Sequence, residues 1–179
     1  MNTTATSDTL KSKIRHIPDF PKPGILFYDI TTLLQDRDGL RLAIDALSAP
    51  YATSNIDLVV GIESRGFILG AAVADRLGAG FVPVRKVGKL PAKTVRVSYD
   101  LEYGTDSLEM HQDAISGAHQ VLIVDDLLAT GGTARATVDL VCGLGGTVHG
   151  VAFLIELVAL KGRSKLEGES VMSVLQYEE

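Results

Sequence analysis

Short apolar runs alternate with longer helical patterns along the chain from residue 58 onward. The apolar runs predict buried strands over residues 58–62, 81–85, 121–124 and 147–157. Apolar residues recur with helical spacing over 66–77 and 133–144, and Gly78 and Gly145 mark the ends of these two helices. Continuously apolar strands joined by helices are typical of a parallel sheet whose two faces are both covered. We therefore expect a doubly wound α/β fold, with a mostly parallel central sheet and helices on both faces.

The first 32 residues do not follow this alternation. They contain a predicted helix with Leu10, Ile14 and Ile17 on one face. The sequence Phe-Pro-Lys-Pro-Gly at 20–24 comes next and is incompatible with regular structure. Residues 1–32 are expected to form a small N-terminal hood.

A second departure lies between residues 86 and 112. Val95, Val97 and Tyr99 alternate with polar residues, which indicates a half-exposed antiparallel excursion. We expect this excursion to be a flexible loop inserted into a single domain that spans residues 1–179. The chain shows neither an internal repeat nor a low-complexity segment.

The composition is that of a globular protein, with 46% hydrophobic and 22% charged residues among 179. Seventeen basic residues against 22 acidic ones give a net charge of -5. This balance argues against a protein that coats nucleic acid, since affinity for the phosphate backbone comes from clustered Lys and Arg. It leaves room for a local basic patch around a small phosphorylated ligand.

The single cysteine, Cys142, excludes an intramolecular disulfide and favours a reducing compartment. It lies among apolar residues of a predicted helix, so we expect it to be a small buried side chain. The longest apolar run, residues 150–160, is interrupted by Glu156 and is too short to cross a membrane. The first residues lack the features of a secretory signal, so a cytoplasmic location is expected.

The residues after the predicted strand 121–124 carry the strongest chemical pattern. Asp125 and Asp126 come where this strand leaves the sheet, and a small polar turn then opens a helix. That turn consists of Ala129, Thr130, Gly131, Gly132 and Thr133. Ligands of parallel sheets bind outside the carboxyl ends of the strands, and a helix N-terminus favours phosphate. Two carboxylates beside a phosphate suit the hydroxyls of a ribose.

The alternative is that both acids only cap a turn, but two carboxylates directly after a buried strand are costly without partners. The pattern is also distinct from the common nucleotide loops. The chain has neither the Gly-Lys-Ser/Thr of a P-loop nor a Gly-x-Gly-x-x-Gly after a strand. Kinase and dehydrogenase functions are therefore disfavoured.

A second segment, Gly-Ile-Glu-Ser-Arg-Gly-Phe at 61–67, follows the first core strand. It places Glu63, Ser64 and Arg65 at a strand-to-helix turn, and Arg is suited to bidentate phosphate contacts. On its own, such a turn is equally compatible with a simple helix cap.

A third segment, residues 85–91, holds the cations Arg85, Lys86 and Lys89. A charge run of this kind is more often a solvated surface than a site. Beside the other two segments, it is consistent with a pyrophosphate-binding group. The histidines His16, His111, His119 and His149 do not form a zinc-binding spacing, so no directly ligated metal is expected.

The pattern over residues 121–133 resembles the type I phosphoribosyltransferases. The resemblance implies that Asp125 and Asp126 bind the ribose 2- and 3-hydroxyls of phosphoribosyl pyrophosphate, and that the turn 129–133 binds its 5-phosphate. It implies that residues 61–67 form the pyrophosphate loop, with Arg65 as a catalytic residue and a cis peptide bond before the serine. The cations of 85–91 are then expected to meet pyrophosphate, whose Mg²⁺ is carried mainly by the substrate.

Residues 20–31 and 99–104 lie outside this core and resemble the members of the family that use adenine. With them, the resemblance covers nearly all of residues 16–178. It implies that Phe27 stacks on adenine while the backbone groups of Leu26 and Tyr28 read its Watson–Crick edge. A base with the reversed donor and acceptor pattern would leave buried polar groups unpaired.

Tyr28 departs from the Arg that many relatives carry before Asp-Ile. Backbone reading is unaffected by this difference, whereas any side-chain contact with the nucleotide is put in doubt. The resemblance also implies that Glu102 meets N7 of adenine and that Tyr103 contacts phosphoribosyl pyrophosphate or AMP. The alternatives are a core aromatic for Phe27 and a solvated surface carboxylate for Glu102.

The resemblance therefore implies an enzyme of purine salvage that converts adenine and phosphoribosyl pyrophosphate into AMP and pyrophosphate. A transferase for another base, such as xanthine or guanine, is the nearest alternative. A non-catalytic purine-sensing regulator is a second alternative, but it would need a nucleic-acid-binding surface that the net charge does not provide. We expect a homodimer, and we expect neither a nucleic-acid nor a membrane partner.

Overall fold

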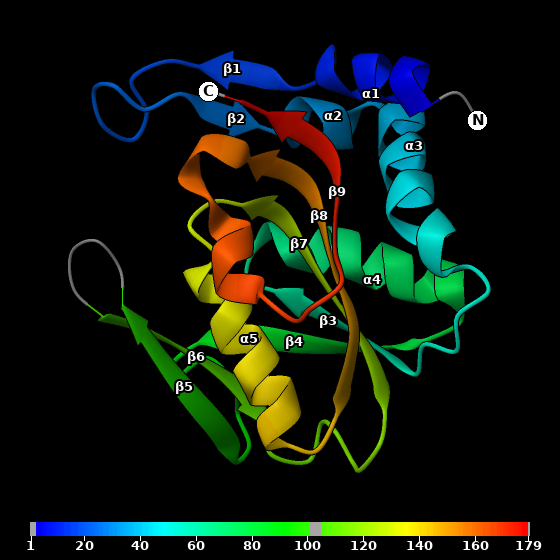
Figure 1. The fold of residues 1–179 in the computed structure, drawn as a ribbon, viewed down its shortest axis with the longest axis vertical. Coiled ribbons are helices and arrows are strands. Elements are labelled where there is room, and N and C mark those ends of the chain that lie inside the picture. Colours follow the sequence, from blue (N-terminus) through cyan, green and yellow to red (C-terminus); the bar gives the residue numbers. More distant parts are fainter. Residues whose placement is uncertain (1–2, 101–104, 179) are drawn as a thin grey trace. The chain divides into compact units, whose positions relative to one another are not determined.

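The computed structural model describes residues 3–100 and 105–178 (Figure 1). The side chains of residues 3, 4 and 100 are not described. The chain divides into two compact units, Met1–Ala46 and Leu47–Glu179. The expectation of a single domain over 1–179, with a hood to about residue 32, stays a prediction.

The first unit combines short helices with a small antiparallel sheet. Its elements are α1 (Thr3–Lys11), β1 (Arg15–Ile17), β2 (Phe27–Asp29), α2 (Thr31–Gln35) and α3 (Arg37–Ser48) up to Ala46. The predicted helix that would place Leu10, Ile14 and Ile17 on one face is wrong beyond Lys11. The chain leaves the helix because Arg15–Ile17 pairs with Phe27–Asp29. Residues 20–24 are irregular, as expected.

The second unit contains a sheet in the order β5-β6-β4-β3-β7-β8-β9. Its elements are η1 (Ala49–Tyr51), β3 (Leu58–Ile62), α4 (Arg65–Leu77), β4 (Gly80–Lys86), β5 (Thr94–Asp100), β6 (Thr105–His111), β7 (Gln120–Leu128), α5 (Gly132–Gly143), β8 (Thr147–Leu157), η2 (Val158–Leu160), η3 (Gly162–Leu166) and β9 (Val171–Tyr177). Strands β4, β3, β7, β8 and β9 run parallel to one another. The hairpin β5–β6 adds to β4 in the antiparallel sense, which confirms the predicted excursion.

Helices α4 and α5 cover opposite faces of this sheet (Figure 1). Successive side chains of a strand point to opposite faces. Val60 and Ile62 of β3 belong to the buried cluster that includes Val138 and Val141 of α5. Gly61 lies between them in sequence and faces α4, where a Cβ on it would meet the backbone oxygen of Gly66 at 2.8 Å. The predicted α/β fold is confirmed.

Several element boundaries were predictable and others were not. The strands at 58–62 and 147–157 match the predicted ranges, and α4 ends at Gly78, whose φ of 67° fits a left-handed cap. Strand β7 continues past its predicted end to Leu128 because residues 125–128 still pair with β8.

The expectation that Cys142 is buried is wrong, since α5 turns its thiol outward beside buried Val141.

Within the described residues, no helix has both the length and the apolar character needed to cross a membrane.

Candidate active site

The chain reverses its direction of winding between β3 and β7. From β3 it crosses through α4 to β4 on one side, and from β7 it crosses through α5 to β8 on the other. The two strands pair in parallel up to Gly61 and Val124, so their carboxyl ends meet at one edge. Such a switch point leaves a crevice where open α/β sheets bind ligands. The sequence thus brings the turn after β3 and the acids of β7 together.

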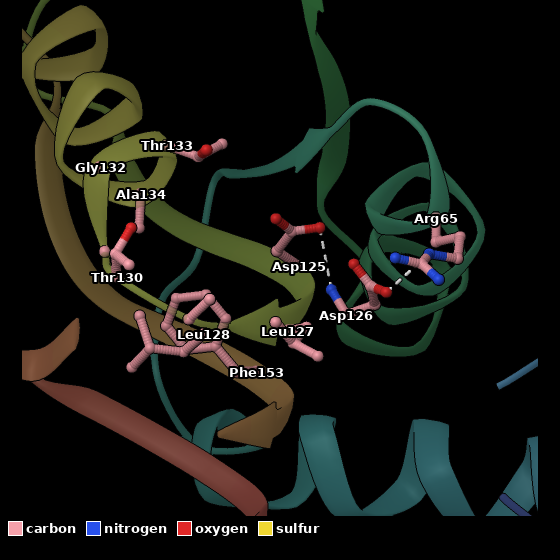
Figure 2. A pocket seen from close by; sticks show the side chains of 12 residues that line it. Arg65, Asp125, Asp126, Leu127, Leu128, Thr130, Gly132, Thr133, Ala134 and Phe153 are labelled. Atoms are coloured by element: carbon pink, nitrogen blue, oxygen red, sulfur yellow. Dashed lines mark hydrogen bonds and ion pairs between the residues drawn. The ribbon is translucent and has the colours of Figure 1, made fainter. Parts of the chain in front are cut away.

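A cavity of about 210 Å³ lies at this edge (Figure 2). It is lined by Arg65, Asp125, Asp126, Leu127, Leu128, Ala129, Thr130, Gly131, Gly132, Thr133, Ala134 and Phe153. Both predicted acids, the predicted phosphate loop and Arg65 therefore share one cavity. Glu63, Ser64, Arg85, Lys86 and Lys89 are not among the residues that line it.

The two acids form the polar centre of the cavity. The backbone N–H of Asp126 donates to Oδ1 of Asp125 at 2.9 Å. The guanidinium of Arg65 lies 2.7 Å from Oδ2 of Asp126, a contact drawn in Figure 2. Asp126 is 7% exposed, so the carboxylate of this ion pair is shielded from solvent. Arg65 therefore connects the turn after β3 to the acids of β7.

Burial sets the protonation behaviour of these acids. Burial, followed by the negative charge of Asp126, raises the pKa of Asp125 well above its ordinary value. Burial also raises the pKa of Asp126, and the charge of Arg65 opposes that rise. Two adjacent carboxylates are costly to ionise together unless a ligand donates hydrogen bonds to them. The pair is therefore suited to accept hydrogen bonds from vicinal hydroxyls.

The turn at 129–133 is shaped to hold an anion. Gly131 has a φ of 79°, which favours glycine, and it precedes the first residue of α5. Backbone N–H groups at a helix N-terminus point outward unpaired and carry partial positive charge. The hydroxyl of Thr133 donates to the hydroxyl of Tyr99 on β5 at 3.2 Å. This arrangement can bind a phosphate monoester through backbone N–H groups and threonine hydroxyls.

Glu63 gathers the predicted basic segment around itself. Its carboxylate accepts hydrogen bonds from Nε of Arg85 and from the backbone N–H of Lys86, both at 3.2 Å, and pairs with the Lys89 ammonium. Burial raises the pKa of Glu63, but the hydrogen bonds from these three groups outweigh it and lower the pKa overall. The Glu63 carboxylate thus holds Arg85 and Lys89 in place, whereas the Lys86 ammonium pairs with Asp106 at 2.9 Å. The predicted cis bond between Glu63 and Ser64 is confirmed.

The predicted base-reading segment lies in the first unit. Leu26 is 36% exposed, and Phe27 packs edge-to-face on Phe20 with ring centroids 5.0 Å apart. Tyr28 is buried and packs in the same manner on His16 at 5.0 Å. An exposed Leu26 and a partly exposed Phe27 leave this segment able to meet a ligand.

Glu102 and Tyr103 lie outside the described residues, so their predicted roles stay predictions. Among the residues that are described, no group of three or more His, Cys, Asp and Glu side chains is placed to hold a metal ion. The expectation that Mg²⁺ comes with the substrate stays a prediction.

Sequence reasoning missed two contacts of the phosphate loop. One is the Tyr99 hydroxyl, which lies 34 positions before Thr133 in the sequence. The other is Gly162, which packs directly against the loop backbone. The alternation around Tyr99 showed that one side of the strand faces inward, but neither partner is visible without the tertiary structure.

The chain is similar to known proteins over most of its length. The family model of the phosphoribosyl transferase domain matches residues 30–175. The adenine phosphoribosyltransferase of Acidobacterium capsulatum is 62% identical over 172 residues, which cover 96% of this chain and 95% of that protein. That of Solibacter usitatus is 62% identical over 169 residues, covering 94% of this chain and 98% of that protein.

Solved structures show the same likeness. The crystal structure of adenine phosphoribosyltransferase from Rhodothermus marinus is 57% identical, with a TM-score of 0.93, covering 97% of this chain and 99% of that one. The Saccharomyces cerevisiae enzyme, solved with an imino-altritol bisphosphate and adenine, is 41% identical, with a TM-score of 0.91. The alignment covers 96% of this chain and 99% of the yeast chain.

Proposed function

The chain belongs to the adenine phosphoribosyltransferase family, and from this membership we propose that it transfers 5-phosphoribose from phosphoribosyl pyrophosphate to adenine, releasing AMP and pyrophosphate. The observation that carries the proposal for this chain is the shared cavity. It joins two partly desolvated acids, an arginine and a helix N-terminus at the switch point between β3 and β7. This is the set of groups that a phosphorylated ribose needs.

Each part of the cavity is assigned one part of the substrate. Asp125 and Asp126 accept hydrogen bonds from the 2- and 3-hydroxyls of the ribose, and the turn 129–133 donates backbone N–H groups to the 5-phosphate. Arg65 is fixed on Asp126, and it lines the cavity, where its positive charge suits a pyrophosphate oxygen. The acids and the arginine therefore orient the two ends of the bond that breaks.

The reaction moves charge in two directions. Positive charge builds on the ribose as pyrophosphate leaves, and negative charge builds on the departing oxygens. Carboxylates beside the ribose and cations beside the pyrophosphate stabilise these changes when both are held in place beforehand. The cluster of Glu63 with Arg85, Lys86 and Lys89 is assigned to the pyrophosphate side. Mg²⁺ enters as part of the substrate, as the counter-ion of pyrophosphate.

The selection of the base is assigned to Leu26, Phe27 and Tyr28. The backbone C=O and N–H groups of such a segment match the 6-amino group and N1 of adenine and mismatch hypoxanthine. The proposal is supported by the yeast relative, whose structure contains adenine. The mismatch leaves one buried polar group unpaired on each side and is worth about 1–3 kcal/mol per group.

The test is incubation of the chain with phosphoribosyl pyrophosphate, Mg²⁺ and one base at a time, with products identified by mass. Adenine is expected to give efficient turnover, whereas hypoxanthine, guanine, xanthine and orotate are not. A kcat/KM for hypoxanthine comparable to that for adenine would refute the base assignment. Failure with every base would favour a purine-sensing role instead.

The proposal includes a cytoplasmic homodimer. A location in a reducing compartment is supported by the single cysteine, and a two-fold dimer is the commonest assembly among soluble homo-oligomers. Light scattering at micromolar concentration is expected to give twice the 19.1 kDa of one chain. A measured mass equal to that of one chain would contradict the dimer but would not contradict the assigned reaction.

A further inference from the structure

The phosphate loop is packed from behind by a segment that has no part in the roles assigned above. Gly162, the first residue of η3, lies against the backbone of Ala129 and Gly131. A Cβ built on Gly162 would lie 2.2 Å from the carbonyl oxygen of Ala129, and a Cβ on Gly131 would lie 2.3 Å from the carbonyl oxygen of Gly162. Backbone touches backbone here, without a side chain between the two segments.

Glycine is required at position 162 because there is no room for a Cβ atom. Gly131 has a φ of 79°, so its identity is explained by conformation as well as by contact. Gly162 is not among the positive-φ residues of the described chain, so an alanine could adopt its backbone conformation. The methyl group alone would have to displace the Ala129 carbonyl, and with it the loop that carries the unpaired N–H groups of α5.

The segment that presents Gly162 is anchored firmly on the sheet. Arg163 makes a two-pronged ion pair with Glu156 of β8, with Nε–Oε1 and NH2–Oε2 distances of 2.7 and 2.8 Å. NH1 of Arg163 also donates to the carbonyl oxygen of Val171 at 2.9 Å. Glu156 is 4% exposed and accepts a further hydrogen bond from Gln176 of β9 at 3.1 Å. A bidentate pair with a buried carboxylate fixes both position and orientation.

A second anchor also follows the glycine along η3. Leu166, at the other end of η3, is 1% exposed and belongs to the buried cluster that includes Leu128 and Ala134 beside the loop. With Arg163 held by β8 and β9 and Leu166 held in the core, Gly162 has little freedom to retreat from the loop. In Figure 1, η3 is the orange segment next to the start of α5.

We propose that η3 is a positioning element for the phosphate loop, with Gly162 as the contact and the Arg163–Glu156 pair as its anchor. The proposal rests on the assignment of the loop to the 5-phosphate. Gly162 sets the path of residues 129–131 so that the following N–H groups converge on one point before the substrate arrives. A preformed site loses less free energy on binding than one that must be ordered by its ligand.

The test compares Gly162→Ala with Gly143→Ala. Gly143 lies at the end of α5 and is not among the positive-φ residues, and a methyl group added to it would point into open space. For each variant we would measure the KM for phosphoribosyl pyrophosphate, the KM for adenine, the kcat, the thermal midpoint, and the Kd for ribose 5-phosphate by calorimetry. The binding measurement needs no turnover.

In Gly162→Ala, the KM for phosphoribosyl pyrophosphate and the Kd for ribose 5-phosphate should rise about tenfold or more, as expected when one charge-assisted hydrogen bond is lost. The KM for adenine should stay within about threefold. Gly143→Ala should bind like the wild type. A folded Gly162→Ala variant with unchanged binding of ribose 5-phosphate would overturn the proposal, whatever its thermal midpoint.

A second variant covers the case in which Gly162→Ala does not fold. Arg163→Lys keeps the charge next to Glu156 but loses the two-pronged geometry. It should raise the Kd for ribose 5-phosphate by a few-fold, and an unchanged Kd would overturn the proposal. If the wild type turns over no base, the assigned reaction fails; if it turns over adenine and the variants bind normally, only this inference fails.

Discussion

Replacement of Asp125 by Asn separates what this acid does for binding from what it does to stability. The amide oxygen can still accept the 2.9 Å hydrogen bond from the Asp126 N–H, so the local geometry is retained. What disappears is the negative charge, which burial and Asp126 make unfavourable in the folded chain. We expect the variant to be more stable than the wild type at neutral pH by about 1–2 kcal/mol, a usual gain when a strained functional residue is replaced.

The sign of the pH dependence follows from the raised pKa of Asp125. Between the unfolded value of about 3.9 and the higher folded value, the folded chain holds the proton more tightly, so the wild type loses stability as pH rises through this window. Asparagine does not titrate. The stability advantage of Asp125→Asn should therefore be smallest near pH 4 and largest above the folded pKa.

Ligand binding should change in the opposite direction. A hydrogen bond to a charged acceptor contributes about 1.5–3 kcal/mol, which corresponds to a loss of about 10- to 150-fold in affinity for AMP. Urea unfolding from pH 4 to 8 and calorimetric titration with AMP measure the two effects. Asp139→Asn is the control, because Asp139 is a partly exposed acid of α5 paired with Arg135. An Asp125→Asn variant that is less stable at pH 8 and binds AMP normally would refute the reasoning.

Three further predictions follow from other contacts. Tyr99→Phe removes the partner of the Thr133 hydroxyl and should raise the KM for phosphoribosyl pyrophosphate by a few-fold in steady-state assays, with the KM for adenine unchanged. Asp29 has a pKa lowered to about 2, chiefly by hydrogen bonds from Thr31, so its contribution to stability should be lost as pH falls from about 4 towards 2. When thermal unfolding is measured over this pH range, Asp29→Asn should not show this part of the decrease in stability. Glu102→Leu should lower the single-turnover rate by about 100-fold while leaving AMP affinity within a few-fold, and an unchanged rate would make Glu102 a surface residue.

The sheet of the second unit was readable from the sequence because its pattern is local. Apolar runs and terminal glycines predicted β3, β8 and the end of α4. The end of β7 was misjudged, because Asp125 and Asp126 are polar yet lie inside the strand, which still pairs with β8 at Asp125, Leu127 and Leu128. Acids inside a strand are a feature of a ligand site, where hydrogen bonds from a ligand replace apolar packing.

The elements that were missed depend on distant partners. The strand Arg15–Ile17 forms only because Phe27–Asp29 lies beside it, and β9 pairs with β8 although most of its side chains are only partly buried. Helix α3 could have been found, since Leu40, Ala43, Ile44 and Leu47 have helical spacing.

The motifs of the site could be found from the sequence because, like the strands, they are local patterns. Asp125, Asp126 and the turn 129–133 are contiguous in sequence, and Arg65 follows a predicted strand. The supporting contacts were not found, since Gly162 shows its importance only through the carbonyl of Ala129 33 positions earlier. Sequence patterns thus revealed the groups that meet the ligand but not those that hold them in place.

The division of the chain into Met1–Ala46 and Leu47–Glu179 has an evolutionary consequence. The segment assigned to the Watson–Crick edge of the base belongs to the first unit, whereas the acids, the phosphate loop and its support belong to the second. Mutations that change how the Watson–Crick edge is read can therefore accumulate in a stretch of fewer than fifty residues. The sugar-phosphate machinery can stay constant under selection while its acceptor diversifies. A designer who wants a new nucleotide product would randomise the first unit together with Glu102 and leave the sugar-phosphate site untouched.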